Sequence, residues 1–307
     1  GRMRFMSDAR RELHPILAAL LWTSHTLSMD YALPMHEMVA LSENYAAVSS
    51  WSVAEPWRLM HDDKWESIPL GQWLNGVREN QVDTLPEKWF NINDDLACLR
   101  IWENVSHEEH WAYPIGCLIS WWSRGSARLI SVEWRSSARY VEVAVTGVGE
   151  GAGVLELESR RCADRGYFWS VENTGPETAM ASLNALAARL LVAQLVAQQS
   201  GGSLSVEVDQ GEWISMVLKI PRADAISAVE LEACLLPADA AEEALLRYVT
   251  PMLIRGWLNM GSQLLDALER KMPQLAESEK AEVIEETEKL QRAGEKLSEL
   301  LCLLQEA

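Results

Sequence analysis

Residues 181–221 read ASLNALAARLLVAQLVAQQSGGSLSVEVDQGEWISMVLKIP and decide the fold of the middle of the chain. The first part, residues 181–199, is rich in Ala and Leu, which favours a helix, and the pair Gly201 and Gly202 ends it. SLSVEV and WISMVLKIP then flank a polar turn at residues 209–211. The stretch therefore predicts a strong helix followed by an antiparallel hairpin.

A mixture of helices and strands extends upstream, over residues 65–221 as a whole. WESIPLGQWLNGVREN predicts a short connection into a helix near residues 70–79, and HEEHWAYPIGCLISWWSRGSA predicts a helix near residues 107–123. Alternating or β-branched runs punctuated by glycine predict strands in TLPEKWFNI, SARYVEVAVTG, GVLELESRR and GYFWSVENTG. Helices mixed with antiparallel strands indicate an α+β fold, a two-layer sandwich.

The N-terminal residues 5–63 predict a helical hairpin. Apolar residues at helical spacing run from Leu13 to Leu27, a break follows at residues 30–34, and a second amphipathic stretch begins at Met35. A hairpin of this size has too little core to stand alone. We therefore expect two copies to pair as a four-helix bundle, which makes the protein a homodimer.

Residues 222–307 predict a C-terminal helical module. A long helical stretch from about Ala238 to Lys271 is interrupted at Pro251. Near heptad spacing in the last stretch indicates a helical hairpin or a coiled partner helix, with Glu and Lys on the other faces. The apolar positions are Val283, Ile284, Leu290, Leu297, Leu300 and Leu301. The predicted domains are thus residues 5–63, 64–221 and 222–307.

Composition excludes several classes of protein. The 307 residues carry a formal net charge of −18, which argues against a nucleic-acid or anionic-membrane surface because phosphates and acidic lipids recruit Lys and Arg. No apolar run approaches the roughly 18 residues of a membrane span, and the N-terminus, GRMRF, lacks an apolar signal segment. The 5 cysteines form no CxxC pair, which favours reduced thiols. We expect a cytoplasmic protein without a membrane or nucleic-acid partner.

The order of elements resembles that of a histidine kinase. ENTGP at 172–176, the helix ending in Gly-Gly and the hairpin closing with Pro221 together resemble the end of a histidine-kinase ATP-binding domain. Leu13-His14-Pro15 resembles the family's dimerisation hairpin, whose first helix carries the phospho-accepting histidine shortly before a proline. The resemblance covers about residues 5–221 and implies a histidine-kinase-like ATPase α/β sandwich after that hairpin.

The residues that carry ATP chemistry in this family are mostly missing. The resemblance implies magnesium-binding asparagines on the helix near residues 107–123, which offers few oxygen ligands. It implies an adenine-binding acid at Asn173, in a turn that also contains Gly175, and a glycine-rich phosphate segment at residues 182–186, which read SLNAL. We therefore expect no cofactor and no metal, and interpret Asn173 and Gly175 as a relic nucleotide turn. A residual nucleotide site there stays open as an alternative.

These losses favour a non-catalytic function. We expect a pseudo-histidine-kinase signalling adaptor that dimerises and binds regulator proteins, and the resemblance implies a response-regulator receiver domain or another signalling protein as the partner. The alternative is an ATP-independent histidine phosphotransferase that relays phosphate to a receiver domain through His14, with Asp8 or Glu12 as the acidic neighbour. An ordinary packing or capping role beside Pro15 is the other interpretation of His14.

Three further patterns have structural interpretations. His107 and His110 lack the HExxH spacing and a third ligand, so a solvated helix start is favoured over a metal site. GVGEGAG at residues 147–153 precedes a strand rather than a helix, which favours a hairpin turn over a dinucleotide loop. Eleven of the 14 tryptophans lie between Trp22 and Trp134. They indicate either packing of the hairpin against the sandwich or an aromatic ligand pocket.

Overall fold

The protein has a mixed α+β fold divided into two compact units, one of residues 51–170 and 189–242 and the other of residues 1–50, 171–188 and 243–307. The predicted α+β class is confirmed, while the division into three consecutive domains stays a prediction. The computed structural model describes residues 16, 19–20, 22–33, 64–80, 91–105, 111–124, 127–149, 181–208, 214–244 and 250–306. In those ranges no helix is both long and apolar enough to cross a membrane.

A four-stranded antiparallel sheet is the centre of the first unit. Its strands are β3 (Ala127–Ser136), β4 (Tyr140–Gly149), β5 (Ser203–Val208) and β6 (Ile214–Pro221), in the order β3-β4-β6-β5. The predicted hairpin of β5 and β6 is confirmed, as is the strand in SARYVEVAVTG. The sequence interpretation missed β3. It was also wrong for residues 147–149, which continue β4 instead of beginning a turn.

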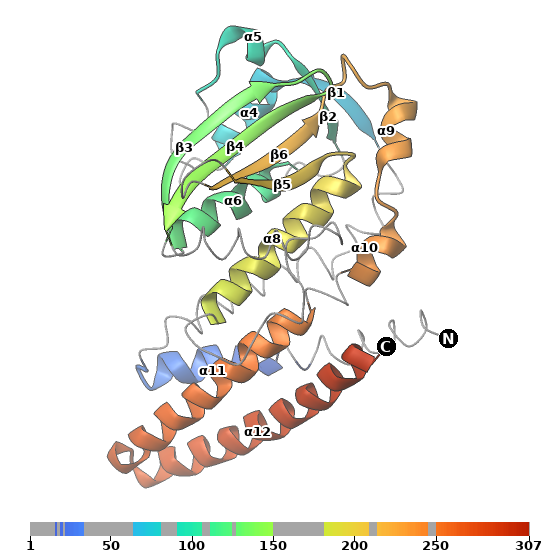
Figure 1. The fold of residues 1–307 in the computed structure, drawn as a ribbon. Helices are drawn as coiled ribbons and strands as arrows, with labels where there is room; N and C mark the ends of the chain where they lie inside the picture. Colours follow the sequence, from blue (N-terminus) through green and yellow to red (C-terminus); the bar gives the residue numbers. More distant parts are fainter. Residues whose placement is uncertain are drawn as a thin grey trace. The chain divides into compact units, whose positions relative to one another are not determined.

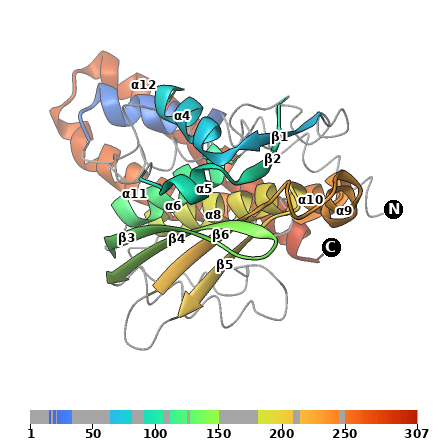
Figure 2. The same ribbon diagram turned by 90° about the horizontal axis from the view of Figure 1, so that it is seen from above.

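The sheet buries one face against two helices. Val141, Val143 and Val145 alternate along β4, and all three are fully buried because period-two alternation directs them to the same side. Helix α6 (Ala112–Arg124) and residues 189–199 of helix α8 (Ala181–Gln199) lie on that side (Figures 1 and 2). Both helices were predicted from the sequence, and the described part of the unit forms a helix layer on a sheet layer.

The opposite face of the sheet carries a ladder of charges across three strands. Arg135 on β3 and Lys219 on β6 both approach Glu142 on β4, at 2.7 Å and 3.7 Å between nitrogen and oxygen. The register places each of these residues directly beside its partner. Opposite charges at paired positions favour this register over one shifted by a residue.

A smaller antiparallel ribbon is made by β1 (Trp65–Pro69) and β2 (Arg100–Asn104). Residues 65–69 were interpreted as a connection, and that interpretation was wrong because they pair along their whole length with β2. Helix α4 (Leu70–Asn80) follows at once and confirms the predicted helix near residues 70–79. A short helix, α5 (Asp94–Ala97), precedes β2. The apolar stripe that α4 buries has helical spacing and consists of Leu70, Trp73, Leu74 and Val77.

Helix α8 ends at the predicted glycine pair. The Gly202 N–H donates to the carbonyl of Ala197, and the Gly201 N–H donates to that of Gln198, which is the bonding pattern of a Schellman C-cap. Gly201 has φ of 72°, the left-handed conformation that this cap requires. Gly202 has no such φ, but a Cβ there would lie 2.2 Å from the Lys219 carbonyl oxygen and 2.8 Å from Cη2 of Trp111. Each glycine is therefore required for a different reason.

The C-terminal helices are α9 (Ala228–Cys234), α10 (Ala238–Ala244), α11 (Thr250–Lys271) and α12 (Glu277–Glu306), with the 3-10 helix η5 (Met272–Gln274) between the last two. α11 and α12 lie side by side (Figure 1) and confirm the predicted helical hairpin. Val283, Leu290 and Leu297 are buried at strict seven-residue intervals. Ile284, which the heptad interpretation included, is 49% exposed, so that assignment was wrong.

Residues 22–30 form a helix in the same compact unit as α11 and α12. Its buried face contains Ser24 and Leu27, and the helical residue Leu20, one turn earlier, is buried at the same spacing. At its end, burial raises the pKa of Tyr31, and the nearby charges of Glu282, Glu279 and Asp30 raise it further. The end of this helix therefore lies close to the first turns of α12. The second predicted helix of the hairpin, after residue 34, lies outside the described residues.

The glycine pair gives a first test. Gly202→Ala should lower the free energy of unfolding by about 3 kcal/mol or more, because its methyl group meets a backbone oxygen that cannot move away cheaply. Gly201→Ala should cost about 1–2 kcal/mol, since it strains φ but meets only the flexible Cδ1 of Leu231, at 2.7 Å. Urea unfolding followed by circular dichroism measures both. Equal losses would contradict the close approach at Gly202.

The seam of α12 gives a second test. Leu297→Ala should cost about 2–5 kcal/mol, because Leu297 is fully buried and its removal leaves a cavity. Ile284→Ala, on the same helix, should change the urea midpoint little since its side chain is half exposed. If the two variants unfolded at the same urea concentration, the assigned face of α12 would be incorrect.

Candidate functional site

The three residues singled out by sequence, His14, Asn173 and Gly175, lie outside the described residues, as do His107 and His110. The geometry of a phosphotransfer or nucleotide site at these positions is therefore still a prediction. Helix α6, helix α8 and the sheet are described, and the resemblance assigns other parts of such a site to them.

Helix α6 is the element on which the resemblance puts magnesium ligands. Its residues, AYPIGCLISWWSR, include no Asp, Asn, Glu or Gln. Cys117 and Leu118, in its middle, are buried at 1% and 0% exposure. Mg²⁺ prefers carboxylate, amide and water oxygens in octahedral geometry, and this helix offers no carboxylate or amide side chain. Among the described residues, no group of three or more His, Cys, Asp or Glu side chains could hold a metal ion.

The start of α8 corresponds to the expected phosphate segment. Residues 182–186 are already helical, since α8 begins at Ala181. A glycine-rich loop surrounds phosphate with non-helical backbone, whereas a helix presents only the N–H groups of its first turn. The backbone at residues 182–186 is therefore unlike a phosphate-binding loop, in agreement with the missing glycines.

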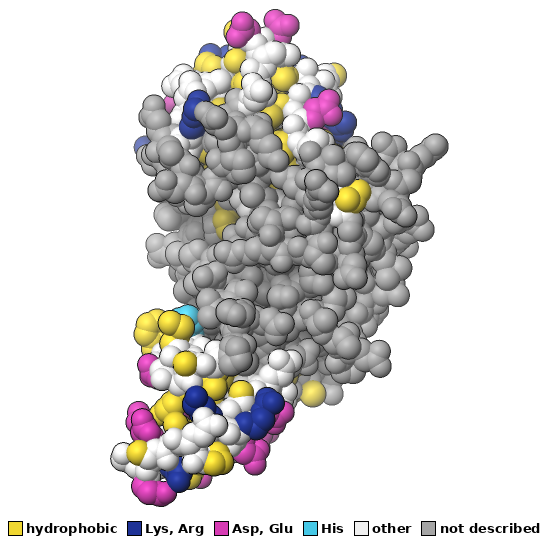
Figure 3. Space-filling view, turned by 90° about the vertical axis from the view of Figure 1, so that its left-hand side faces the viewer, with side chains coloured by type: hydrophobic (Ala, Val, Ile, Leu, Met, Phe, Trp, Pro, Cys, Tyr) yellow, Lys and Arg dark blue, Asp and Glu magenta, His cyan; other side chains and the backbone are white. Residues whose placement is uncertain are grey.

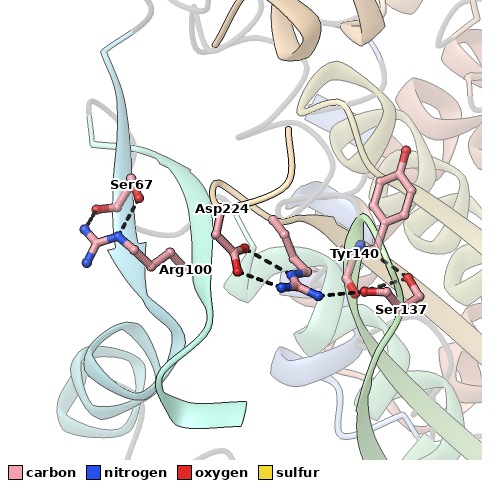
Figure 4. A network of polar contacts seen from close by, with 6 residues as sticks. Ser67, Arg100, Ser137, Tyr140 and Asp224 are labelled. Carbon is pink, nitrogen blue, oxygen red and sulfur yellow. Dashed lines mark hydrogen bonds and ion pairs between the residues drawn. The ribbon is translucent and has the colours of Figure 1, made fainter. Parts of the chain in front are cut away.

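The turn after β6 joins three parts of the sandwich through a polar network (Figure 4). The guanidinium of Arg222 donates to both carboxylate oxygens of Asp224, at 3.0 Å and 2.6 Å, and to the carbonyl of Ser137, at 2.8 Å. The hydrogen bond from Arg222 is the main reason why the pKa of Asp224 is lowered. Beside it, the Ala223 N–H donates to the carbonyl of Arg100, whose own guanidinium donates to Ser67. The network holds the β1–β2 ribbon against the end of β6.

Two tryptophans contribute hydrogen bonds to the same junction. The Trp111 indole, which is fully buried, donates to the Trp102 carbonyl at 2.9 Å. The Trp102 indole donates to the Ile226 carbonyl at 2.8 Å. Trp73 and Trp134 are also buried, at 7% and 8% exposure. These four residues pack within the unit that contains the sheets, whereas packing of the N-terminal hairpin against the sandwich stays a prediction. Trp22 differs, since 74% of it is exposed.

Glu103 is a titratable residue that the sequence interpretation missed. It lies on β2, is 3% exposed, and neither of its carboxylate oxygens has a hydrogen-bond partner in the described part of the chain. Burial raises its pKa to about 8. The Trp73 indole opposes this shift, although its Nε1 reaches hydrogen-bond geometry with neither oxygen. The signal in the sequence is the alternation in RIWEN, which puts Glu103 on the same side of the strand as the fully buried Ile101.

No protein-family model matches the chain, and no curated protein matches its sequence. The likeness to histidine kinases therefore rests on the order of elements and on the sequence motifs, and any function taken from it is a proposal.

The polar junction gives a third test. Arg222→Lys should lower the free energy of unfolding by about 1–2 kcal/mol, because a lysine cannot reproduce the two-oxygen contact with Asp224 together with the bond to Ser137. Arg139→Lys is the matched control: its guanidinium is half exposed and meets one oxygen of Glu230 at 3.5 Å, so the urea midpoint should hardly change.

The same pair has a defined pH dependence. Because the pKa of Asp224 is lowered in the folded protein, its stabilising contribution is present above its ordinary value of 3.8 and is lost as the pH falls through the folded value. The decrease in the free energy of unfolding that Arg222→Lys causes should therefore be larger at pH 6 than at pH 2.5. A loss independent of pH would mean that the ion pair contributes nothing.

Proposed function

We propose that the protein is a non-catalytic signalling adaptor of the pseudo-histidine-kinase type, which forms a homodimer and binds a regulator protein in the cytoplasm. A response-regulator receiver domain is the partner that the resemblance implies. The observation that carries the proposal is an exposed apolar face on the N-terminal helix. Trp22 is 74% exposed and Met29 is 64% exposed, and residues seven apart lie on the same side of a helix.

This face has the chemistry of a protein-binding surface. Tryptophan buries a large apolar area at low entropic cost and is enriched where protein interfaces are strongest, and methionine adapts its shape to a partner. In the lower part of Figure 3, exposed hydrophobic side chains gather beside acidic and basic ones. The basic side chains Lys280, Lys289 and Arg292 of α12 each pair with a glutamate of the same helix. An apolar face beside such paired charges favours a second protein over a nucleic acid.

The non-catalytic part of the proposal is supported by α6 and α8. A helix without carboxylate or amide side chains cannot hold Mg²⁺ in the way that the resemblance requires. A phosphate segment that is helical from Ala181 onward, and has no glycine, does not provide the backbone of a phosphate loop. Both observations argue against ATP hydrolysis and leave dimerisation and partner binding as the functions of the helices.

Dimerisation is tested by charge on the exposed face. Light scattering should report a dimer for the native chain and a monomer for the double variant Trp22→Glu, Met29→Glu, because two carboxylates cannot be buried in an apolar interface without a large cost. Val229→Glu, at a residue that is 76% exposed on α9, is the control and should stay dimeric. A monomeric native chain, or a double variant that stays dimeric, would refute the role of this face.

Phosphotransfer is tested separately. The adaptor should give a flat calorimetric trace with millimolar ATP and should accept no phosphate from a phosphorylated receiver domain. Transfer that His14→Ala abolishes would favour the alternative, an ATP-independent histidine phosphotransferase. Transfer that survives His14→Ala would exclude His14 from the mechanism and also contradict the adaptor.

A further inference from the structure

The β1–β2 ribbon contains an arrangement that the proposed function does not use. Glu103 and Trp73 bring a carboxyl group and an indole N–H into one buried region between β2 and α4, and neither group has a hydrogen-bond partner among the described residues. A buried charge without a partner is strongly disfavoured, whereas a neutral carboxylic acid is tolerated at much lower cost. The fold as described is therefore compatible with the protonated acid and poorly compatible with the carboxylate.

Within the part of the chain that the structure describes, the surroundings of Glu103 provide no countercharge. The elements around β2 are β1, α4 and β6 with the turn after it. The described charged side chains on them are Lys64 and Glu66 on or beside β1, Arg78 on α4, and Lys219, Arg222 and Asp224 on β6 and its turn, with Arg100 on β2 itself. None of them shifts the pKa of Glu103, whose causes are burial and the Trp73 indole. Lys219 pairs with Glu142, and Arg222 pairs with Asp224.

We propose that the protonation state of Glu103 controls how firmly the β1–β2 ribbon packs on α4. When the acid is neutral, the ribbon stays closed over Trp73. When the acid loses its proton to water, the carboxylate needs solvent or a partner, and the ribbon must loosen to supply it. The proton is exchanged with solvent, and no other group changes charge. This proposal concerns the unit that contains the sheet and does not depend on the function proposed above.

The sign of the pH dependence follows from proton linkage. The unfolded chain ionises Glu103 above its ordinary value of 4.5, whereas the folded protein keeps the proton until about pH 8. Between these values the folded state binds one more proton, so its stability falls as the pH rises and levels off above about pH 8. One proton changes the unfolding equilibrium constant by about tenfold per pH unit within that window.

The first experiment compares the native protein with Glu103→Gln, which keeps the size of the side chain and cannot ionise. Urea unfolding should give a ratio of unfolding constants, native over variant, that rises about tenfold per pH unit between pH 5.5 and 7.5. Because the two proteins differ only at residue 103, the contributions of all other titratable groups to the pH dependence cancel in the ratio. Glu66→Gln is the control, because Glu66 lies opposite Glu103 in the register but is exposed, and its ratio should stay constant. A constant ratio for Glu103→Gln as well would overturn the proposal.

A second measurement needs no variant and locates the effect. The ¹³C shift of the Glu103 carboxyl should titrate near pH 8, and a midpoint near 4.5 would overturn the proposal. Hydrogen exchange then compares the native protein with Glu103→Gln. Between pH 6.5 and 9 the protection of β1 and β2, corrected for the intrinsic rate at each pH, should fall at least about tenfold more in the native protein than in the variant. Equal changes in the two proteins would refute control of the ribbon by Glu103.

Discussion

The sandwich depends on the close packing at Gly202, where the space beside the Cα atom holds a hydrogen atom but no methyl group. At Gly202 the turn from α8 into β5 passes directly over the Lys219 carbonyl and against the ring of Trp111. Residues far apart in the chain thus meet at van der Waals distance. Because interiors are packed as densely as organic crystals, an added methyl group there displaces a strand or a ring. The position of α8 on the sheet is therefore fixed by the absence of a side chain.

Trp111 connects the close packing at Gly202 to the β1–β2 ribbon. Its ring packs at Gly202, and its indole N–H donates to the Trp102 carbonyl in β2, whose own indole donates to the Ile226 carbonyl after β6. A buried indole contributes a large apolar surface and one directed hydrogen bond, so a few tryptophans can fix two sheets relative to one another. The enrichment of tryptophan in the first part of the chain has a structural explanation at these positions. Trp22 is outside that explanation, which is why its exposure bears on partner binding.

The fold was predictable from sequence where one periodicity dominated. The helix at residues 181–199 and its Gly201-Gly202 end, the β5–β6 hairpin and the α11–α12 pair all follow from local spacing and cap chemistry. β1 was missed because a five-residue strand has too few alternations to distinguish it from a connection. The burial of Glu103 was missed because the alternation in RIWEN puts Glu103 on the side of Ile101 but does not say that this side is buried, and tertiary packing decides that. The roles of His14, Asn173 and Gly175 come from the resemblance to histidine kinases, and a resemblance does not give the positions of side chains.

The burial of Glu103 follows from the register of its strand. Arg100 binds Ser67, Ile101 forms a bridge to Arg222, and Trp102 donates to the Ile226 carbonyl, so β2 is held along its length by partners on both sides. A shift of one residue would release Glu103 to the surface, but it would also expose Ile101 and break each of these contacts. Glu103 therefore stays buried, although its burial is unfavourable, because the favourable contacts of Arg100, Ile101 and Trp102 require the same strand register. A local opening that leaves this register intact is the cheapest way to hydrate the carboxylate, which is why loosening from α4, and not re-pairing of the strands, is the expected response to its ionisation.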